Sequence, residues 1–261
     1  FRDLISAGEV RLARFPNPNN VAIARLTLFF PNHSYMLGAL AEEFPDVYRF
    51  SVSVFPSEDD DVVTSPYNAM LSCAALAEHA DCVMPVENQA LMDIVGSIGA
   101  SRDRCDARSG SALTGVDGAV VGGRGGRPWA AMNGIAANLL LNLTAGARFD
   151  GALNVDINEV TTNLVPFPKM HFLLSAMSPA TVSADKGKTV PVPRTMDQIF
   201  TEVFQRDRQL ASVDPRHSTY LACALMMRGA VTVSDANRNV ERLRKGLRMA
   251  HWVGDGFKVR Y

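Results

Sequence analysis

The sequence predicts an α/β protein, and three observations lead to that prediction. Short segments rich in β-branched and aromatic residues alternate along the chain with segments whose apolar residues recur at helical spacing. Apolar residues make up 47% and charged residues 20%, the balance of an ordinary globular protein. A length of 261 residues corresponds to one large domain or two modest ones. Alternating strands and helices of this kind are typical of α/β architecture.

The first predicted elements are a strand, a helix and a second strand. The apolar run over residues 21–30 predicts the first strand, and turn-forming residues flank it on both sides. Residues 35–44 favour a helix that ends before Pro45. The β-branched and aromatic residues of 47–55 predict the second strand, and an acidic loop follows over 56–61.

A second helix, a strand and a third helix come next. Residues 66–80 predict a helix, because Pro66 suits a first turn, where its missing N–H costs nothing. The short apolar run 82–86 predicts a strand, and the spacing of apolar residues over 87–98 is again helical.

The middle of the chain contrasts a glycine-rich stretch with a strongly apolar one. Residues 96–128 contain nine glycines and few large apolar residues, so we expect an exposed, flexible insert there. Residues 129–147 predict one long helix that is apolar nearly all round. Such a helix is normally buried between layers or domains.

The C-terminal part again alternates. Residues 169–177 and 220–228 predict strands, whereas residues 195–205 and the highly charged stretch 234–248 predict helices. Two short strands are expected after the last helix. We find no internal repeat and no heptad pattern.

Charge and cysteine usage argue against several classes of protein. The net charge of −1 gives no basic excess for binding nucleic acid. No apolar run approaches the roughly 20 residues that a membrane span needs, and no secretory signal is visible. The four cysteines are scattered without a CxxC pair, so we expect free thiols rather than disulfides or a zinc site.

Two local motifs resemble phosphate-binding loops but lack their context. Gly187-Lys188-Thr189 matches the end of a P-loop, but Val182 stands where the motif requires its first glycine. The glycines between Gly115 and Gly126 do not form GxGxxG between a strand and a helix. His171 and His217 are expected to be structural rather than catalytic.

One long segment carries a resemblance to a known family. The sequence WAAMNGIAANLLLNLTAGARFDGALNVDINEVTTNLVPFPKMHFLL, at 129–174, resembles the central helix of the tubulin family and the loop and strand after it. The segments SPYNAMLSCAALAEHADCVMPVENQALMDI and DPRHSTYLACALMMRG, and the terminal GFKV, also resemble tubulins. The resemblance covers roughly residues 30–260 and is greatest to the epsilon branch, whose members belong to centrioles and basal bodies.

The resemblance implies a tubulin/FtsZ-like fold with three parts. Residues 1–128 would form a partial, Rossmann-like GTPase domain that includes the glycine-rich insert 96–128. Residues 129–147 would form the long central helix. Residues 148–261 would form an α+β intermediate domain that is incomplete at its C-terminal end.

Five residues match positions that contact the nucleotide in this family. Asn88 and Asn133 fall where tubulins read the guanine edge, a task that suits an amide because it offers a donor and an acceptor side by side. Trp129 matches the aromatic residue that stacks on the base. Asp61 matches a ribose-side position, and Ser34 matches the serine before the family's phosphate-binding glycine loop. Alternatively, Asn88 is a helix cap and Asp61 one member of a solvated acidic run.

Two acidic residues match the loop that reaches a neighbouring subunit's nucleotide. Glu159 occupies the position at which α-like chains orient the water that attacks the γ-phosphate, and Asp156 precedes it. The resemblance therefore implies that this chain completes a neighbour's site. The alternative is that both acids stabilise the start of a helix.

The sequence departs from the family on the phosphate side. The Gly-Gln-Cys-Gly loop is absent, and the GGGTGSG loop that should follow Ser34 is replaced by YMLGAL, with Gly38 alone. Such loops work because glycine lets backbone N–H groups point at phosphates without strain. Either this is a truncated or internally deleted chain, which we favour, or it is a divergent protein that has lost nucleotide turnover.

The resemblance implies a cytoskeletal protein that binds GTP or GDP and assembles with other tubulin subunits, microtubule proteins or centriolar proteins. Its expected location is the cytoplasm, in the cytoskeleton and the centrosome or basal body. An intact member would also hold Mg²⁺, for which we identify no ligand. The alternative is an interaction module with a tubulin scaffold that binds no nucleotide; an unrelated metabolic enzyme has little support.

Overall fold

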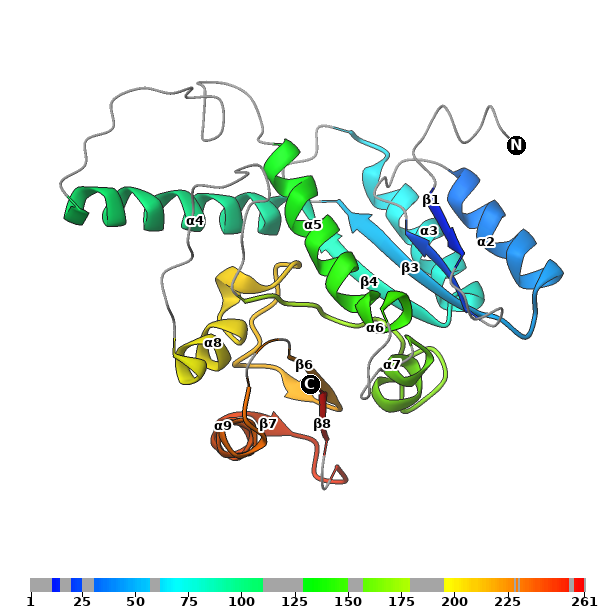
Figure 1. The fold of residues 1–261 in the computed structure, drawn as a ribbon. Helices are drawn as coiled ribbons and strands as arrows, with labels where there is room; N and C mark the ends of the chain where they lie inside the picture. The colour runs from blue at the N-terminus through cyan, green and yellow to red at the C-terminus, as the bar shows by residue number, and fades with distance from the viewer. Residues whose placement is uncertain are drawn as a thin grey trace.

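The chain forms an α/β unit followed by a smaller unit of helices and short strands (Figure 1). The computed structural model describes residues 11–14, 20–24, 31–56, 62–109, 129–149, 157–178, 195–227, 229, 231–253 and 256–260. The first unit contains β1 (Arg11–Arg14), β2 (Asn20–Ala24), α2 (Pro31–Glu43), β3 (Tyr48–Phe55), α3 (Ser65–His79), β4 (Cys82–Glu87), α4 (Asn88–Ser109), α5 (Trp129–Leu143) and α6 (Ala145–Arg148). The second contains α7 (Ile157–Leu164), α8 (Met196–Val203), the 3₁₀ turn η1 (Arg206–Arg208), β5 (Thr219–Tyr220), β6 (Cys223–Met226), α9 (Val233–Gly246), β7 (Arg248–Met249) and β8 (Phe257–Arg260).

A four-stranded sheet in the order β1-β2-β3-β4 organises the first unit. Strand β1 pairs with β2 in antiparallel fashion, whereas β2, β3 and β4 run parallel. Parallel strands need long crossover connections, and α2 and α3 provide them. The predicted α/β class is therefore confirmed for this unit.

Helices cover both faces of the sheet. On one face Leu37 of α2 and Leu76 of α3 pack with Val83 of β4. On the other face, Leu91 of α4 and Ile135 of α5 belong to the core that includes alternate residues of β3 and β4. Successive strand residues point to opposite faces, so both faces of β4 need apolar residues. Its sequence Cys-Val-Met-Pro-Val satisfies that need.

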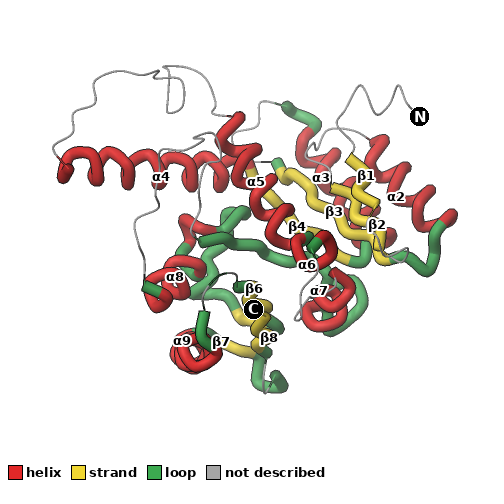
Figure 2. Tube along the Cα trace, viewed as in Figure 1, coloured by secondary structure: helices red, strands yellow, loops and turns green. Residues whose placement is uncertain are grey.

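Two segments of the second unit complete the first. The backbone of Val83 accepts a hydrogen bond from Leu173 N at 2.7 Å and donates one to His171 O at 2.8 Å, which adds a single parallel bridge beside β4. Leu210 is fully buried in the core formed with α4 and α5. The connecting segments are drawn as loops in Figure 2.

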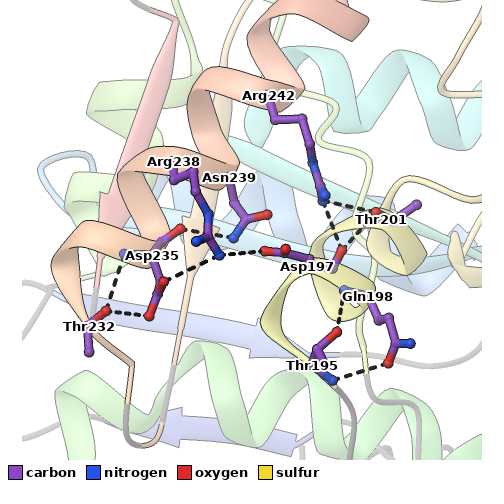
Figure 3. Close-up of polar contacts among 9 residues, drawn as sticks. All are labelled: Thr195, Asp197, Gln198, Thr201, Thr232, Asp235, Arg238, Asn239 and Arg242. Carbon is purple, nitrogen blue, oxygen red and sulfur yellow. Dashed lines mark hydrogen bonds and ion pairs between the residues drawn. The ribbon is translucent and has the colours of Figure 1, made fainter.

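The second unit has its own small core and a polar contact between two helices. Phe200, Phe204 and Leu225 form this core with residues of α9, β5 and β8 around them. Strand β5 pairs with β7, and β6 with β8. Figure 3 shows the polar side chains that join α8 to α9, among them Asp197 and Arg238 at 3.1 Å.

Most predicted helices and strands of the described residues are confirmed with shifted ends. The helix predicted over 35–44 is α2, which begins earlier at Pro31. The predicted strands 47–55 and 82–86 are β3 and β4, and the predicted helix 66–80 is α3 with its proline in the first turn. The helices predicted over 195–205 and 234–248 are α8 and α9, and the two short strands after α9 are β7 and β8.

The predicted insert is wrong over residues 96–109, because α4 continues to Ser109. Only Gly96 and Gly99 of the nine glycines lie in this stretch, and a Cβ on Gly96 would meet no other atom. Each glycine costs a helix about 1 kcal/mol relative to alanine, whereas the alanines and arginines around these two are among the strongest helix formers. Residues 110–128 lie outside the described residues.

The single helix predicted over 129–147 is interrupted. Helix α5 ends at Leu143, and the hydroxyl of Thr144 donates to Leu140 O at 2.7 Å. A threonine hydroxyl competes in this way with the backbone at helix ends. Helix α5 also has an exposed side, with Asn133 on it, so the expected burial all round is wrong.

The two predicted strands at 169–177 and 220–228 are also corrected. Lys169 has a φ of 68°, and the extended chain after it makes only isolated bridges, at Phe172 and Ala176, to two different partners. The second segment divides into β5 and β6, which pair with different strands. In both segments the residues are extended, but no single strand pairs with the whole segment.

Candidate functional site

Three of the predicted binding residues, Asn88, Trp129 and Asn133, lie in helices that begin toward the carboxyl edge of the sheet. Strands β2, β3 and β4 are parallel, so their carboxyl ends lie at one edge, and α2, α3 and α4 begin there. The first turns of α5 lie toward the same edge (Figure 1), and Ala131 and Met132 belong to one core with Leu91 of the first turn of α4. Ligands of open α/β sheets bind outside the carboxyl ends of the strands.

Asn88 stands at the junction of β4 and α4. Strand β4 ends at Glu87, and α4 begins at Asn88, whose side chain is half-buried. The strand is held between both helical layers, so the junction is fixed from two sides. This placement fits both sequence interpretations, a helix start and an amide presented to a ligand.

Trp129 and Asn133 lie on one side of α5. They are four residues apart, so they are neighbours on the helix surface. Trp129 is 48% exposed and Asn133 is exposed, whereas Ala131, Met132 and Ile135 point into the core with α4. The core contacts thus turn one side of α5 inward and leave the predicted binding side open at the carboxyl edge.

Glu159 is not brought together with these three residues. It lies in the first turn of α7, beyond α6, at the opposite end of α5 from Trp129 (Figure 1). Helix α5 has 15 residues and so spans about 22 Å. The Glu159 carboxylate therefore lies on a different part of the surface from Asn88 and Asn133.

The other predicted site residues are only partly described. Ser34 is the fourth residue of α2, and its side chain lies outside the described residues. Asp61 and Asp156 lie outside them altogether. The stretch from His33 to Gly38, where tubulins carry glycines, is helical here, and Gly38 lies against the His79 side chain.

Glu87 is a residue that the sequence analysis did not single out. Its carboxylate Oε2 accepts a hydrogen bond from Ser212 N at 2.9 Å, and its own N–H donates to Leu210 O at 2.8 Å. The available signal was an acidic residue at the end of an otherwise apolar strand, directly before Asn88.

The described cysteines and histidines have structural environments. Cys73, Cys82 and Cys223 are free thiols, as predicted, and burial raises the pKa of Cys82 and of Cys223 to about 12. His171 is buried, with Nε2 3.1 Å from Leu76 O. His217 is exposed and pairs with Asp214, whose pKa this contact lowers. The thiols of Cys82 and Cys223 are therefore poor nucleophiles, because the thiolate is the reactive form and a raised pKa keeps the thiol protonated.

The described part of the chain shows no group of three acidic, histidine or cysteine side chains arranged to hold a metal ion. It assigns no ligand to Mg²⁺. None of the helices described is long and apolar enough to cross a membrane.

Two family models match the sequence and together span more than half of it. Residues 33–96 match the tubulin/FtsZ family GTPase domain. Residues 168–261 match the tubulin C-terminal domain. The first match covers α2 to the start of α4, and the second begins before the extended segment that joins β4.

Curated relatives agree with these models. The chain is 48% identical over 230 residues to the tubulin epsilon chain of Mus musculus, which covers 87% of this chain and 48% of that protein. It is 47% identical to the tubulin epsilon chain of Homo sapiens, with the same coverage. It is 33% identical to the tubulin alpha-1 chain of Arabidopsis thaliana, over 86% of this chain and 45% of that one. The chain thus spans about half the length of the relatives it matches, and it belongs to the tubulin family.

Proposed function

We propose that this chain is an epsilon-type cytoskeletal protein that binds GTP or GDP and contributes to microtubule assembly in centrioles and basal bodies. The identity to tubulin epsilon chains supports the type, and the GTPase-domain match supports the ligand. The observation that supports the proposal is that α4 begins at Asn88 and α5 at Trp129, with Asn133 one turn further, and that both helices begin toward the carboxyl edge of the sheet (Figure 1).

In this proposal the carboxyl edge binds the guanine base. The amides of Asn88 and Asn133 read its edge, because each offers a donor and an acceptor, and the Trp129 ring stacks on its face. Helix α5, with the short α6 after it, then forms the central helical segment between the GTPase domain and an intermediate domain over 148–261.

The backbone N–H groups in the first turn of α2 are the candidate partners of the phosphates. The N–H groups at the start of a helix have no partner within the helix, and they favour anions. Asn32, His33 and Ser34 supply three of them at the same edge of the sheet. Asp61 would contact the ribose.

The distant position of Glu159 supports a role on another molecule. Glu159, with Asp156 before it, would complete the nucleotide site of a neighbouring tubulin subunit and align the attacking water there. The partners are therefore other tubulin subunits, together with microtubule or centriolar proteins. The cellular location that follows is the cytoskeleton, at the centrosome or basal body.

Titration of the purified chain with a fluorescent GTP analogue tests base binding. We expect Asn88→Ala and Asn133→Ala each to weaken binding by about tenfold or more, because the base's polar edge would lose its partner. The binding constant is read from fluorescence anisotropy.

The control is Asn142→Ala, since Asn142 is an exposed asparagine near the other end of α5. It should leave the affinity unchanged. An equal loss in all three variants, or no binding by the folded wild-type chain, would contradict the proposal.

The absence of glycines between Ser34 and Gly38 favours a second candidate. There the chain is helical rather than a glycine-rich loop. A tubulin scaffold that docks on tubulin-like partners without nucleotide would show this. A folded chain that binds tubulin but no GTP analogue would select it.

A further inference from the structure

The junction that presents Asn88 is attached to the second unit by two hydrogen bonds from the preceding residue. The Glu87 carboxylate accepts from Ser212 N at 2.9 Å, and Glu87 N donates to Leu210 O at 2.8 Å. A hydrogen bond to a charged acceptor is stronger than a neutral one. Glu87 therefore holds residues 210–212 by both its backbone and its side chain.

The segment that Glu87 holds is also anchored by burial. Gln209, Leu210 and Ala211 are all buried, and Leu210 lies in the core with Leu91 and Ile94, from the first two turns of α4. Leu210 N donates in turn to Ser175 O at 3.0 Å. Movement of this segment would thus remove apolar packing from the start of the helix that carries Asn88.

The far end of the same segment leads into the second unit. Gln209 donates from Nε2 to Val203 O at 2.7 Å, at the end of α8. Phe200 and Phe204 beside it form the core of that unit. A continuous set of contacts therefore runs from the α8 region through residues 209–212 to the β4–α4 junction.

We propose that Glu87 is a positioning residue that couples guanine recognition at Asn88 to the placement of the 209–212 segment. The proposal rests on the proposed function, since it assigns a regulator to the same site. Because coupling is reciprocal, a bound guanine nucleotide stabilises the contact with residues 209–212, and release of that segment weakens guanine binding.

Nucleotide titrations of Glu87→Ala, Glu87→Gln and Gln89→Ala test the coupling. We expect Glu87→Ala to weaken binding of the GTP analogue by about fivefold, because part of the free energy of the lost charge-assisted hydrogen bond is coupled to the position of Asn88. Glutamine keeps an acceptor oxygen and should lose less. Gln89 is the matched control, since its side chain donates to Asp93 on the same helix, at 3.1 Å, rather than to the 209–212 segment.

Two further readouts separate positioning from general destabilisation. The preference for a guanine over an adenine analogue should fall in Glu87→Ala, because the base-reading residue is displaced. Hydrogen exchange at Ser212 N–H should slow in the wild-type chain when the GTP analogue binds, and should not slow in Glu87→Ala.

The outcomes are distinguishable. Wild-type binding that Glu87→Ala leaves unchanged in affinity and base preference overturns the coupling and leaves the proposed function standing. A wild-type chain that binds no guanine nucleotide contradicts both. If Glu87→Ala does not fold, Glu87→Gln and the exchange of Ser212 N–H in the wild-type chain decide: no slowing on binding overturns the coupling.

Discussion

The two units of the molecule are stabilised in different ways. The helices of the α/β unit pack on both faces of a sheet through buried apolar side chains, such as Leu37 on one face and Ile135 on the other. In the second unit, two-stranded sheets offer little surface, and exposed polar contacts join α8 to α9 around its small core (Figure 3). Arg242, for example, donates to Asp197 O at 2.9 Å and to Thr201 Oγ1 at 3.0 Å.

This difference separates two kinds of sensitivity. Buried apolar contacts contribute to stability at every pH and salt concentration at which the chain folds, because they depend on area removed from water. Exposed charged contacts contribute less and are screened by salt. Substitutions of buried apolar residues in the first unit should therefore lower stability strongly and with little dependence on pH. Substitutions of the exposed charged contacts in the second unit should have small effects that depend on pH and salt.

The largest expected effect is that of Ile135→Ala. Its side chain is 0% exposed between α4, α5 and the sheet, so truncation should lower the free energy of unfolding by about 2–5 kcal/mol. Leu141→Ala is the control on the same helix, because Leu141 is 50% exposed. Urea denaturation followed by circular dichroism measures both. Equal losses would show that α5 is not held by its buried side.

A medium effect is expected at the start of α8. Thr195 Oγ1 accepts from Gln198 N at 3.4 Å, and Gln198 Oε1 accepts from Thr195 N at 3.1 Å, which together form a capping box. Thr195→Ala should cost about 1 kcal/mol of stability, whereas Thr195→Ser should cost less. Thermal denaturation of the two variants tests this, and identical melting temperatures for alanine and serine would exclude the cap.

The smallest effect is the acid dependence of the contact between α8 and α9. The Asn239 amide and the Arg238 guanidinium hold the pKa of Asp197 below its ordinary value. A lowered pKa in the folded chain contributes stability above the unfolded value of about 3.9, and that stability is lost as the pH falls through the folded value.

Asp197→Asn should therefore flatten the fall in stability below about pH 4 and change little near neutrality. The denaturation midpoints of the variant and of the wild-type chain are compared below about pH 4 and near neutral pH. Added salt should reduce the difference between the two proteins. A variant whose midpoint drops as steeply in acid as that of the wild-type chain would show that Asp197 carries none of the dependence.

The same contrast explains which elements could be predicted from the sequence. Helices α8 and α9 have a clear apolar side and a charged side, and both begin at a threonine whose side chain accepts a hydrogen bond from the helix. Local pattern therefore specified them closely. For α4, the first turns carry the apolar spacing, whereas its charged continuation to Ser109 has no such pattern and is followed by a glycine-rich stretch, so the local sequence does not predict it as helix.

Extended segments were harder, because their state depends on a partner elsewhere in the chain. The β-forming residues of 169–177 are extended, yet they bridge β4 on one side and Gln209 on another. The candidate site shows the same limit. Asn88 and Asn133 followed from family resemblance, but the bonds of Glu87 to Leu210 and Ser212 join residues far apart in sequence, which no local pattern reveals.

The bridge between Val83 and Phe172 also has a consequence for biosynthesis. Strand β4 leaves the ribosome well before Phe172 and Leu210. During that interval its outer edge has no bridging partner, and the core on one face of the sheet lacks Leu210. Non-local pairings of this kind slow folding and leave strand edges open to other chains. We therefore expect nascent chains that end before these segments to associate with chaperones, and the longer chains to be released.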